Sequence, residues 1–463
     1  MKLNTKYTLS GATVLVLGLG ETGMSLLRWL HLQGANLRVA DSRAQPPGLA
    51  EVRRYVAEGQ IFCGALTDAL FDAVDLIAIS PGVALREPVV ARAVARGIPV
   101  VGDIELFAQN LPSENRPAIL AITGANGKTT VTSMVAHLCQ AAGKDAVAAG
   151  NISPAVLDVV LQRGAQQPEV WVLELSSFQL ETTFNLGANA ATVLNISEDH
   201  MDRYDGLDDY AAAKAQIFAG CGVQVLNRDD PRSIGMVLEH TPCVTFGLSL
   251  PTRPQDFGIE HVGDDIWLVQ GQQRLLNAKE LQVVGLHNVA NALAALALCR
   301  VIDLPMPVLL QALRSFKGLP HRVEYVQTIQ GVAYYDDSKG TNVGATVAAL
   351  EGLRGKNVLI AGGDGKGQDF SPLQPVVSAY ARAVVLIGRD APLLEQALQN
   401  CGVPLLHAAD MAQAVMLASQ QARSGDTVLL SPACASLDMY RNYAHRAEVF
   451  IAAVRDLAET KHG

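Results

Sequence analysis

The sequence predicts an α/β protein of three domains, each built on a mostly parallel sheet. Its 463 residues are enough for roughly three domains at about 150 residues each. Short apolar segments alternate with stretches of helical periodicity along the chain, and this pattern is typical of parallel sheets covered by helices. Apolar residues make up 49% of the chain and charged residues 17%, which excludes a disordered protein.

We expect the first domain to span residues 1–111 and to be Rossmann-like. An amphipathic stretch, Thr22–Leu32, lies between apolar segments that read as strands. These segments are Thr13–Leu17, Leu37–Ala40 and Leu76–Ile79. The polar stretch 111–117, which contains two prolines, is predicted to be a linker and a hinge.

The second domain is expected at residues 112–318 and the third, again Rossmann-like, at 319–463. The second has a long Ala- and Leu-rich helical stretch at His287–Cys299. A second hinge is expected at 317–321. The predicted strands are Ala118–Ile122, Val170–Leu173, Ala191–Ile196 and Val223–Leu226 in the second domain, and Val332–Tyr335, Val358–Ala361, Val384–Ile387 and Val428–Leu430 in the third.

Charge and cysteine content narrow the class of partner. The formal net charge is −9 and no run of Lys and Arg is present, so we expect small-molecule partners and no nucleic acid. The seven cysteines are scattered without a Cys-x-x-Cys pair, which favours a reducing cytoplasm. No apolar run reaches the roughly 18 residues of a spanning helix, so no membrane insertion is expected.

The first glycine-rich loop indicates a diphosphate site. Gly18-Leu-Gly-Glu-Thr-Gly23 follows a predicted strand and opens a helix, and Asp41 ends the next strand. Glycines at this spacing let backbone amides approach a pyrophosphate at a helix N-terminus. Taken alone, the pattern leaves open an NAD or FAD site, another diphosphate ligand with a ribose nearby, or a purely structural turn.

The second loop is more specific and predicts ATP binding. In Thr123-Gly-Ala-Asn-Gly-Lys-Thr-Thr130, backbone amides would surround phosphates, Lys128 would neutralise them and the Thr129 hydroxyl would bind magnesium. The glycines are two residues closer than in Gly-x-x-x-x-Gly-Lys-[Ser/Thr], which points away from GTPases and motor ATPases. A chance Gly-Lys-Thr after a strand is the alternative.

Titratable side chains follow two further predicted strands. Glu174 ends one strand, where it would hold magnesium beside the phosphate loop or simply be solvated. After another strand, four such residues occupy five positions, a density typical of metal or phosphate chemistry: Glu198, Asp199, His200 and Asp202. Lys214 lies in a mostly apolar helical stretch, and by itself this pattern favours a snorkelling lysine.

Taken together, the motifs resemble the Mur ligases of peptidoglycan synthesis, and within that family the members that add D-glutamate. The resemblance runs through all three predicted domains. The motifs that carry it are the two glycine-rich loops, Glu174-Leu-Ser-Ser-Phe-Gln, Glu-Asp-His200-Met-Asp-Arg-Tyr, Asp337-Ser-Lys-Gly-Thr-Asn342 and Ser431-Pro-Ala-Cys-Ala-Ser-Leu-Asp438. The resemblance implies that ATP drives the joining of D-glutamate to UDP-N-acetylmuramoyl-L-alanine through an acyl phosphate, in a cytoplasmic monomer.

The family resemblance also implies a role for individual residues. Lys128, Glu174, His200 and Lys214 would be catalytic, with two magnesium ions held by Thr129, Glu174, His200 and Lys214, the last as a carbamate made from carbon dioxide. The expected ATP site is Gly124, Ala125, Asn126, Gly127, Lys128, Thr129, Thr130, Asn288, Asn291, Arg322 and Asp337. The expected UDP-substrate site is Gly20, Glu21, Thr22, Gly23, Asp41, Ser42, Arg43, Ser80, Gly82 and Asn151. The expected D-glutamate site is Lys339, Thr341, Lys366, Ser436 and Tyr443.

Three positions depart from the pattern expected of close relatives. Tyr443 stands where we expect Phe, and Gly340 and Thr129 replace common Ala and Ser. Two rival functions share parts of the sequence pattern: an amide ligase for another amino acid or a folate-type acceptor, and an ATP-binding switch whose turnover needs no amino acid.

Overall fold

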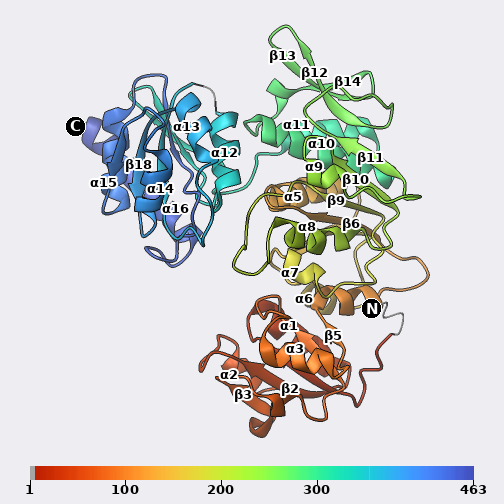
Figure 1. The fold of residues 1–463 in the computed structure, drawn as a ribbon. Helices are drawn as coiled ribbons and strands as arrows, with labels where there is room; N and C mark the ends of the chain where they lie inside the picture. Colours follow the sequence, from red (N-terminus) through yellow and green to blue (C-terminus); the bar gives the residue numbers. More distant parts are fainter. Residues whose placement is uncertain (1–5, 354, 463) are drawn as a thin grey trace.

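The computed structural model describes residues 6–353 and 355–462 and contains three α/β domains (Figure 1). The first domain lies at one end, the central domain in the middle, and the third beside the central domain. The fold class predicted from the sequence is confirmed. Among the described residues, no helix combines the length and the apolar character needed to cross a membrane.

The first domain is a five-stranded parallel sheet in the order β3-β2-β1-β4-β5. The strand order reverses between β1 and β4, and the glycine-rich turn after β1 lies at this switch point. Open α/β sheets bind ligands there. Its elements are β1 (Thr13–Leu17), α1 (Glu21–Leu32), β2 (Asn36–Asp41), α2 (Leu49–Val52), β3 (Ile61–Cys63), β4 (Leu76–Ile79), α3 (Pro88–Ala95), β5 (Val100–Val101) and α4 (Asp103–Gln109).

The central domain has a six-stranded parallel sheet in the order β11-β10-β9-β6-β8-β7. Strands β6 and β8 are neighbours, so the phosphate loop and Glu174 reach the same edge. The elements are β6 (Ala118–Thr123), α5 (Lys128–Ala141), β7 (Ala146–Gly150), α6 (Val156–Arg163), β8 (Val170–Glu174), α7 (Ser177–Leu180), β9 (Ala190–Val193), α8 (Leu207–Ala215), β10 (Val223–Asn227), α9 (Pro231–Ile234) and β11 (Cys243–Phe246).

A second, antiparallel sheet of three strands in this domain was not predicted. It contains β12 (Phe257–Val262), β13 (Asp265–Gln270) and β14 (Gln273–Asn277), and it projects at the top of Figure 1. Polar residues such as Glu260, Asp265 and Arg274 stand among the apolar ones in these strands, so their apolar signal is weaker than that of the buried parallel strands. Helices α10 (Leu286–Val301) and α11 (Met306–Ser315) follow, and α10 packs against α5.

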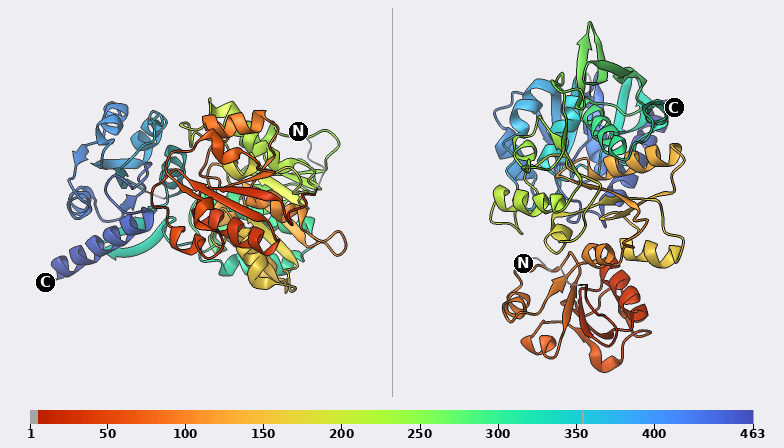
Figure 2. Two further views of the ribbon diagram at one scale, coloured as in Figure 1. Left: turned by 90° about the horizontal axis from the view of Figure 1, so that it is seen from below. Right: turned by 90° about the vertical axis from the view of Figure 1, so that its right-hand side faces the viewer.

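The third domain has a six-stranded sheet in the order β15-β16-β20-β17-β18-β19, with β15 alone antiparallel. Helix α16 continues from this sheet to the C-terminal end (Figure 2, left). The elements are β15 (Glu324–Ile329), β16 (Val332–Asp336), α12 (Val343–Gly352), β17 (Asn357–Gly362), α13 (Leu373–Tyr380), β18 (Ala381–Ile387), α14 (Ala391–Leu398), β19 (Leu405–His407), α15 (Met411–Gln421), β20 (Thr427–Leu430) and α16 (Tyr443–His462).

The first two domains are joined through α4. One apolar cluster runs from the first sheet through α4 to the central sheet, where Phe107 lies edge-on to Trp171 with ring centroids 4.8 Å apart. The buried Glu105 carboxylate accepts the backbone N–H groups of Phe184 and Asn185 at 2.7 and 3.0 Å. The linker at 111–117 therefore follows a helix already docked on the central domain. The apolar clusters of the third domain are separate.

Candidate functional site

The phosphate loop connects β6 to the N-terminus of α5, with Gly124 and Gly127 at φ +155° and +83°. A Cβ on Gly127 would come within 2.7 Å of Asn291 Oδ1, so both the backbone conformation and the space require glycine. Asn195 fixes the loop because its backbone and side-chain oxygens accept the Ala125 and Asn126 amides at 2.9 and 2.8 Å. The N-terminus of α5, presented in this way, is suited to binding an anion.

The Lys128 amine lies over this loop. It donates to the carbonyls of Gly124 and Ala125 at 2.8 and 2.9 Å. Burial lowers the pKa of Lys128, and the carboxylates of Glu174 and Asp199 oppose that shift. Its hydrogen bonds are to weak, neutral acceptors that a phosphate oxygen would replace.

Glu174 ends β8 with a side chain that is 2% exposed. Its Oε1 accepts a hydrogen bond from Asn151 Nδ2 at 2.8 Å, and among the described residues its buried Oε2 has no partner. A buried carboxylate oxygen without a partner is costly unless a cation or donor meets it. The donor set therefore fits a hard divalent cation such as magnesium. Thr129 lies in the first turn of α5, after the loop lysine.

Lys214, on α8, is 1% exposed and so does not snorkel. Its Nζ donates to Thr123 Oγ1 at 3.2 Å and lies 4.7 Å from the centroid of the Tyr210 ring. Burial, followed by the neighbouring Lys128 cation, holds the pKa of Lys214 well below its usual value. A deprotonated amine is a nucleophile, which fits the expected reaction with carbon dioxide.

His200 and its acidic neighbours divide into inward and outward groups. The His200 ring lies 4.8 Å from the Phe178 ring and 3.7 Å from a carboxylate oxygen of Asp199. Burial lowers the pKa of His200. Glu198 and Asp202 are exposed. Only the other two residues of this cluster, Asp199 and His200, turn toward the phosphate loop.

A cavity of about 180 Å³ lies between the first and central domains. Five of the predicted UDP-substrate residues line it: Glu21, Thr22, Ser80, Gly82 and Asn151. Gly20 caps the start of α1. A Cβ added at Gly23 would lie 1.7 Å from the Gly18 carbonyl oxygen, so position 23 of the turn admits only glycine.

Asp41 ends β2, Ser42 and Arg43 follow it, and none of the three lines this cavity. Asp41 accepts the Leu19 amide at 2.7 Å and pairs with the Arg43 guanidinium. Burial opposes ionisation of Asp41, but these hydrogen bonds prevail and lower its pKa to about 2. An ionised carboxylate therefore stands at the end of β2, where a ribose hydroxyl would be bound.

The third domain brings more cations to the same place. Burial lowers the pKa of Arg322, and the negative charge of Glu174 in the central domain opposes this shift. Burial also lowers the pKa of Lys339 to about 8, and Arg322, Glu174 and Lys128 are all close enough to influence it. Asn342 Nδ2 donates to Asn126 Oδ1 of the phosphate loop at 3.0 Å. The structure therefore unites residues that are about 200 positions apart in the chain.

Two of the predicted D-glutamate residues, Tyr443 and Thr341, contact Lys339. Its Nζ stands 3.8 Å from the centroid of the Tyr443 ring, a cation–π contact that Phe would also make. Lys366 reaches toward the central domain and contributes to the lowered pKa of His200. Ser436 is buried, whereas Thr341 is half-buried in the turn that follows Lys339.

The remaining predicted ATP residues are also held in place. Asn291 Nδ2 donates to Asn288 Oδ1 at 3.1 Å on α10, beside the phosphate loop. Asp337 accepts a hydrogen bond from Ser431 Oγ at 2.7 Å, and burial raises its pKa to about 7. Thr130 is buried in the first turn of α5.

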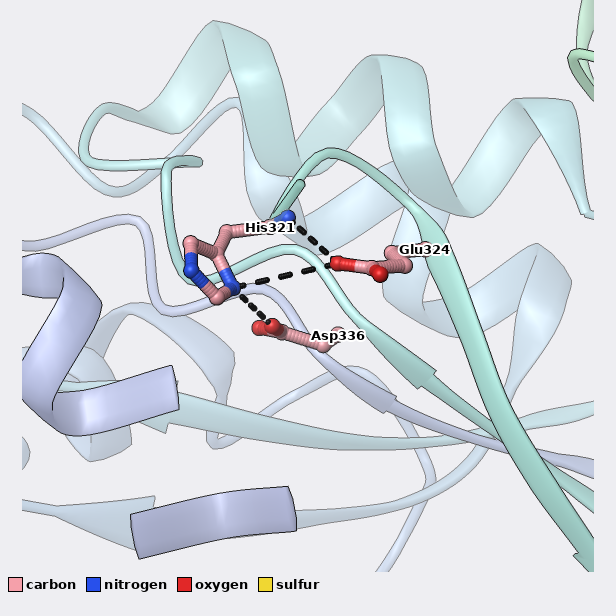
Figure 3. A group of neighbouring side chains, drawn as sticks. All are labelled: His321, Glu324 and Asp336. Carbon is pink, nitrogen blue, oxygen red and sulfur yellow. Dashed lines mark hydrogen bonds and ion pairs between the residues drawn. The ribbon is translucent and has the colours of Figure 1, made fainter. Parts of the chain in front are cut away.

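A group of three side chains supports Arg322 and was not predicted (Figure 3). His321 Nδ1 lies 2.7 Å from the buried Asp336 carboxylate and 3.9 Å from Glu324 Oε2, which also accepts the His321 backbone N–H at 2.8 Å. Within residues 6–353 and 355–462, this is the one group of three His, Cys or acidic residues whose ligand atoms lie close together. These hydrogen bonds fix the turn next to Arg322. The sequence feature that could have revealed this group is Asp336, which directly precedes Asp337.

Arg446 is a second residue that sequence reasoning missed. It is fully buried, and it donates to Ser338 Oγ, Ser338 O and Cys434 O at 3.0, 2.8 and 3.0 Å. Burial lowers its pKa to about 10. It ties together the loops that carry Lys339 and Ser436. Its position on a helix gives no sequence signal, because an arginine there is usually exposed.

Family models match this chain in three consecutive parts. Residues 12–102 match the Mur ligase MurD-like N-terminal domain, residues 122–299 the Mur ligase middle domain, and residues 321–434 the Mur ligase glutamate ligase domain. The chain belongs to the Mur ligase family. The resemblance inferred from the motifs is therefore confirmed, and the dinucleotide oxidoreductase reading of the first loop falls away.

Relatives within the Mur ligase family are similar along nearly the whole chain. The UDP-N-acetylmuramoylalanine–D-glutamate ligase of Nitrosomonas europaea is 56% identical over 455 residues, with 96% of each chain covered. The protein of the same name from Methylobacillus flagellatus is 59% identical over 444 residues, with 96% of this chain and 97% of the relative covered.

Solved structures of Mur ligases and related enzymes share the fold. A pseudomurein peptide ligase type C from Methanothermus fervidus superposes with a TM-score of 0.61 at 18% identity, covering 96% of this chain and all of that one. A UDP-N-acetylmuramate-alanine ligase from Thermotoga maritima gives 0.59 at 19% identity, covering 96% and 99%.

Proposed function

We propose that this Mur ligase joins D-glutamate to UDP-N-acetylmuramoyl-L-alanine and converts ATP to ADP and phosphate. One observation carries the proposal: the third domain contacts the phosphate loop through the Asn342–Asn126 hydrogen bond, and the charge of Glu174 in the central domain acts on both Arg322 and Lys339. An assembly of this kind would hold a triphosphate and an amino acid at one point. The names of the relatives that are 50% to 59% identical supply the substrates.

In the first step, an oxygen of the L-alanyl carboxylate attacks the γ-phosphorus of ATP, and the bond to the β-phosphate oxygen breaks. ADP leaves, and the substrate becomes an acyl phosphate. Lys128 neutralises the charge that develops on the transferred phosphate, and Arg322 approaches from the other domain. The Asn288–Asn291 pair and Asp337 would hold the adenine and ribose ends.

In the second step, the amine of D-glutamate attacks the acyl carbon, loses a proton, and phosphate leaves. The two carboxylates of D-glutamate require cationic and hydroxyl partners, which Lys339, Lys366, Ser436 and Thr341 supply. Tyr443 holds Lys339 by its ring. The amine must be neutral to attack, and water must be excluded so that the acyl phosphate is not hydrolysed.

Magnesium and carbon dioxide belong to this proposal. When bound, two magnesium ions would offset the phosphate charge, with Thr129, Glu174 and His200 as ligands and Lys214 as a carbamate. The Glu174 Oε2 without a partner among the described residues and the lowered pKa of the buried Lys214 amine support this assignment. The amine adds to the carbon of carbon dioxide and releases a proton, which changes a cation site into an anion.

The UDP end of the substrate would lie in the cavity between the first two domains, and the acceptor carboxylate near Asn151 and Glu174. Asn151 lines that cavity and also donates to Glu174, so it links the two ends of the site. We further propose that the enzyme acts in the cytoplasm, where ATP and the nucleotide-linked substrate are made, and that it is a monomer, as the family resemblance implies.

Phosphate release tests the function. UDP-N-acetylmuramoyl-L-alanine and ATP are incubated with D-glutamate, L-glutamate, L-lysine or no amino acid. Release that depends on D-glutamate is expected. Equal rates in all four would refute the ligase assignment and favour an ATP switch, whereas a preference for L-lysine would indicate a different amide ligase.

A further inference from the structure

Three loops of the third domain meet at the carboxyl ends of β17, β18 and β20. The loop after β17 carries Lys366, and the loop after β20 carries Ser436. The loop after β18, Gly388 to Asp390, contains none of the residues predicted to bind a substrate. It nevertheless contacts both of the others, and we call these three residues the brace.

Asp390 holds the Lys366 loop. Its Oδ2 accepts the Gly365 amide at 2.7 Å, and its own amide donates to the Gly363 carbonyl at 3.0 Å. Its side chain is 17% exposed, so both hydrogen bonds are shielded from water. Lys366 follows Gly365 directly and has φ +51°, a conformation that a non-glycine residue adopts only when its surroundings impose it.

Arg389 holds the Ser436 loop to the same point. Its amide donates to Asp438 Oδ2 at 2.9 Å, and its guanidinium pairs with Asp364. The Asp364 backbone is also joined to the Ala435 backbone by reciprocal hydrogen bonds of 2.9 and 2.8 Å. The loops that carry Lys366 and Ser436 are therefore cross-linked through the brace and through each other.

The brace has no room for a larger residue at its first position. Gly388 has φ +74°, and an added Cβ would lie 2.5 Å from Asp438 Oδ2 and 2.7 Å from Gly363 Cα. The close approach of three backbones thus depends on glycine at this position. A side chain here would push the brace away from the loops that carry Lys366 and Ser436.

We propose that Asp390 is a positioning residue for D-glutamate, which sets the orientation of Lys366 relative to Ser436. The inference rests on the proposed function, because it takes these two residues as contacts of the amino acid. Two carboxylates on one small molecule demand donors at a defined separation, so an error in the loops would weaken D-glutamate binding more than ATP or UDP-substrate binding.

The test compares Asp390→Ala with Asp410→Ala in the full-length enzyme. Asp410 is a matched control because it accepts one backbone amide, that of Gln413, at 2.8 Å in the same domain but belongs to the N-terminus of α15. We expect Asp390→Ala to raise the KM for D-glutamate about tenfold or more, with the KM for ATP and for the UDP substrate within about twofold of wild type. Asp410→Ala should lower the Tm and leave all three KM values unchanged.

Two further variants separate positioning from a loss of stability. Gly388→Ala should raise the same KM by displacing the same loops. In a Lys366→Ala background, Asp390→Ala should add less than about twofold, because the lysine it positions is gone. Additive effects of the two changes, or equal shifts in all three KM values, would overturn the proposal.

The proposed function can fail separately from this inference. A wild-type enzyme whose phosphate release does not require D-glutamate would refute the function. A D-glutamate-dependent wild type together with a folded Asp390→Ala variant of unchanged KM would refute the positioning role alone.

Discussion

Lys214 offers the sharpest test of the chemistry, because its burial allows a variant that removes the amine and keeps the packing. Lys214→Met retains the unbranched stem and loses only the amine with its hydrogen bond to Thr123 and its contact with the Tyr210 ring. We expect an unchanged or higher Tm, since the desolvated amine is gone. Activity should fall on the order of 10² to 10³, the usual effect of losing one well-placed charged group.

Lys214→Ala should behave differently. It removes three methylenes and the amine, so the lost burial of about 0.8 kcal/mol per methylene costs about 2 kcal/mol, partly offset by relief of the buried amine. The space left is the size of a short carboxylate. Acetate or propionate should therefore raise the activity of Lys214→Ala, and they should leave Lys214→Met inactive because its stem fills the space.

The assay is phosphate release with D-glutamate, and melting curves confirm that both variants fold. The carbamate reasoning is refuted by a Lys214→Met enzyme with wild-type activity. It is equally refuted by a folded Lys214→Ala enzyme that no short carboxylate rescues. Lys214→Arg serves as a control for charge, and it should also be inactive because a guanidinium does not form the carbamate.

Three other predictions concern the same site and its support. Glu174→Gln keeps the hydrogen bond to Asn151 and removes the charge, so the magnesium concentration for half-maximal activity should rise about tenfold or more in a metal titration, and an unchanged titration would contradict the assignment. Gly127→Ala should weaken ATP binding at least tenfold by calorimetry, because φ is +83° and the new Cβ meets Asn291. Burial raises the pKa of Asp103 to about 6, above its unfolded value, so this carboxyl contributes stability that is complete below about pH 4 and is lost as the pH rises through 6. In Asp103→Asn, the loss of unfolding free energy between pH 4 and pH 7, measured with denaturant, should be smaller than in the wild type by up to about 3 kcal/mol. An equal loss in the variant and the wild type would argue against this role of Asp103.

The sequence by itself determined the elements and the chemistry of the central loop. The strand prediction Thr13–Leu17 and the strand prediction Leu76–Ile79 match the structure, because buried parallel strands are continuous apolar runs with clear ends. The phosphate loop and the strand-end Glu174 could also be placed from the sequence, since backbone conformation there is set by local glycines and by the end of a strand. The antiparallel strands β12–β14, in which polar and apolar residues are mixed, were not predicted.

Only the tertiary structure decided which side chains meet. It buried Lys214, turned Glu198 and Asp202 to solvent, and joined the loop of the third domain that carries Lys339 to the phosphate loop through the Asn342–Asn126 hydrogen bond. It also revealed the supports at Asp336, Arg446 and Asp390, which have no motif of their own. Which side chains are buried and which come into contact depends on residues far apart in the chain. Hydrophobic periodicity reports only on near neighbours. The composition of the site could therefore not be derived from the order of the residues alone.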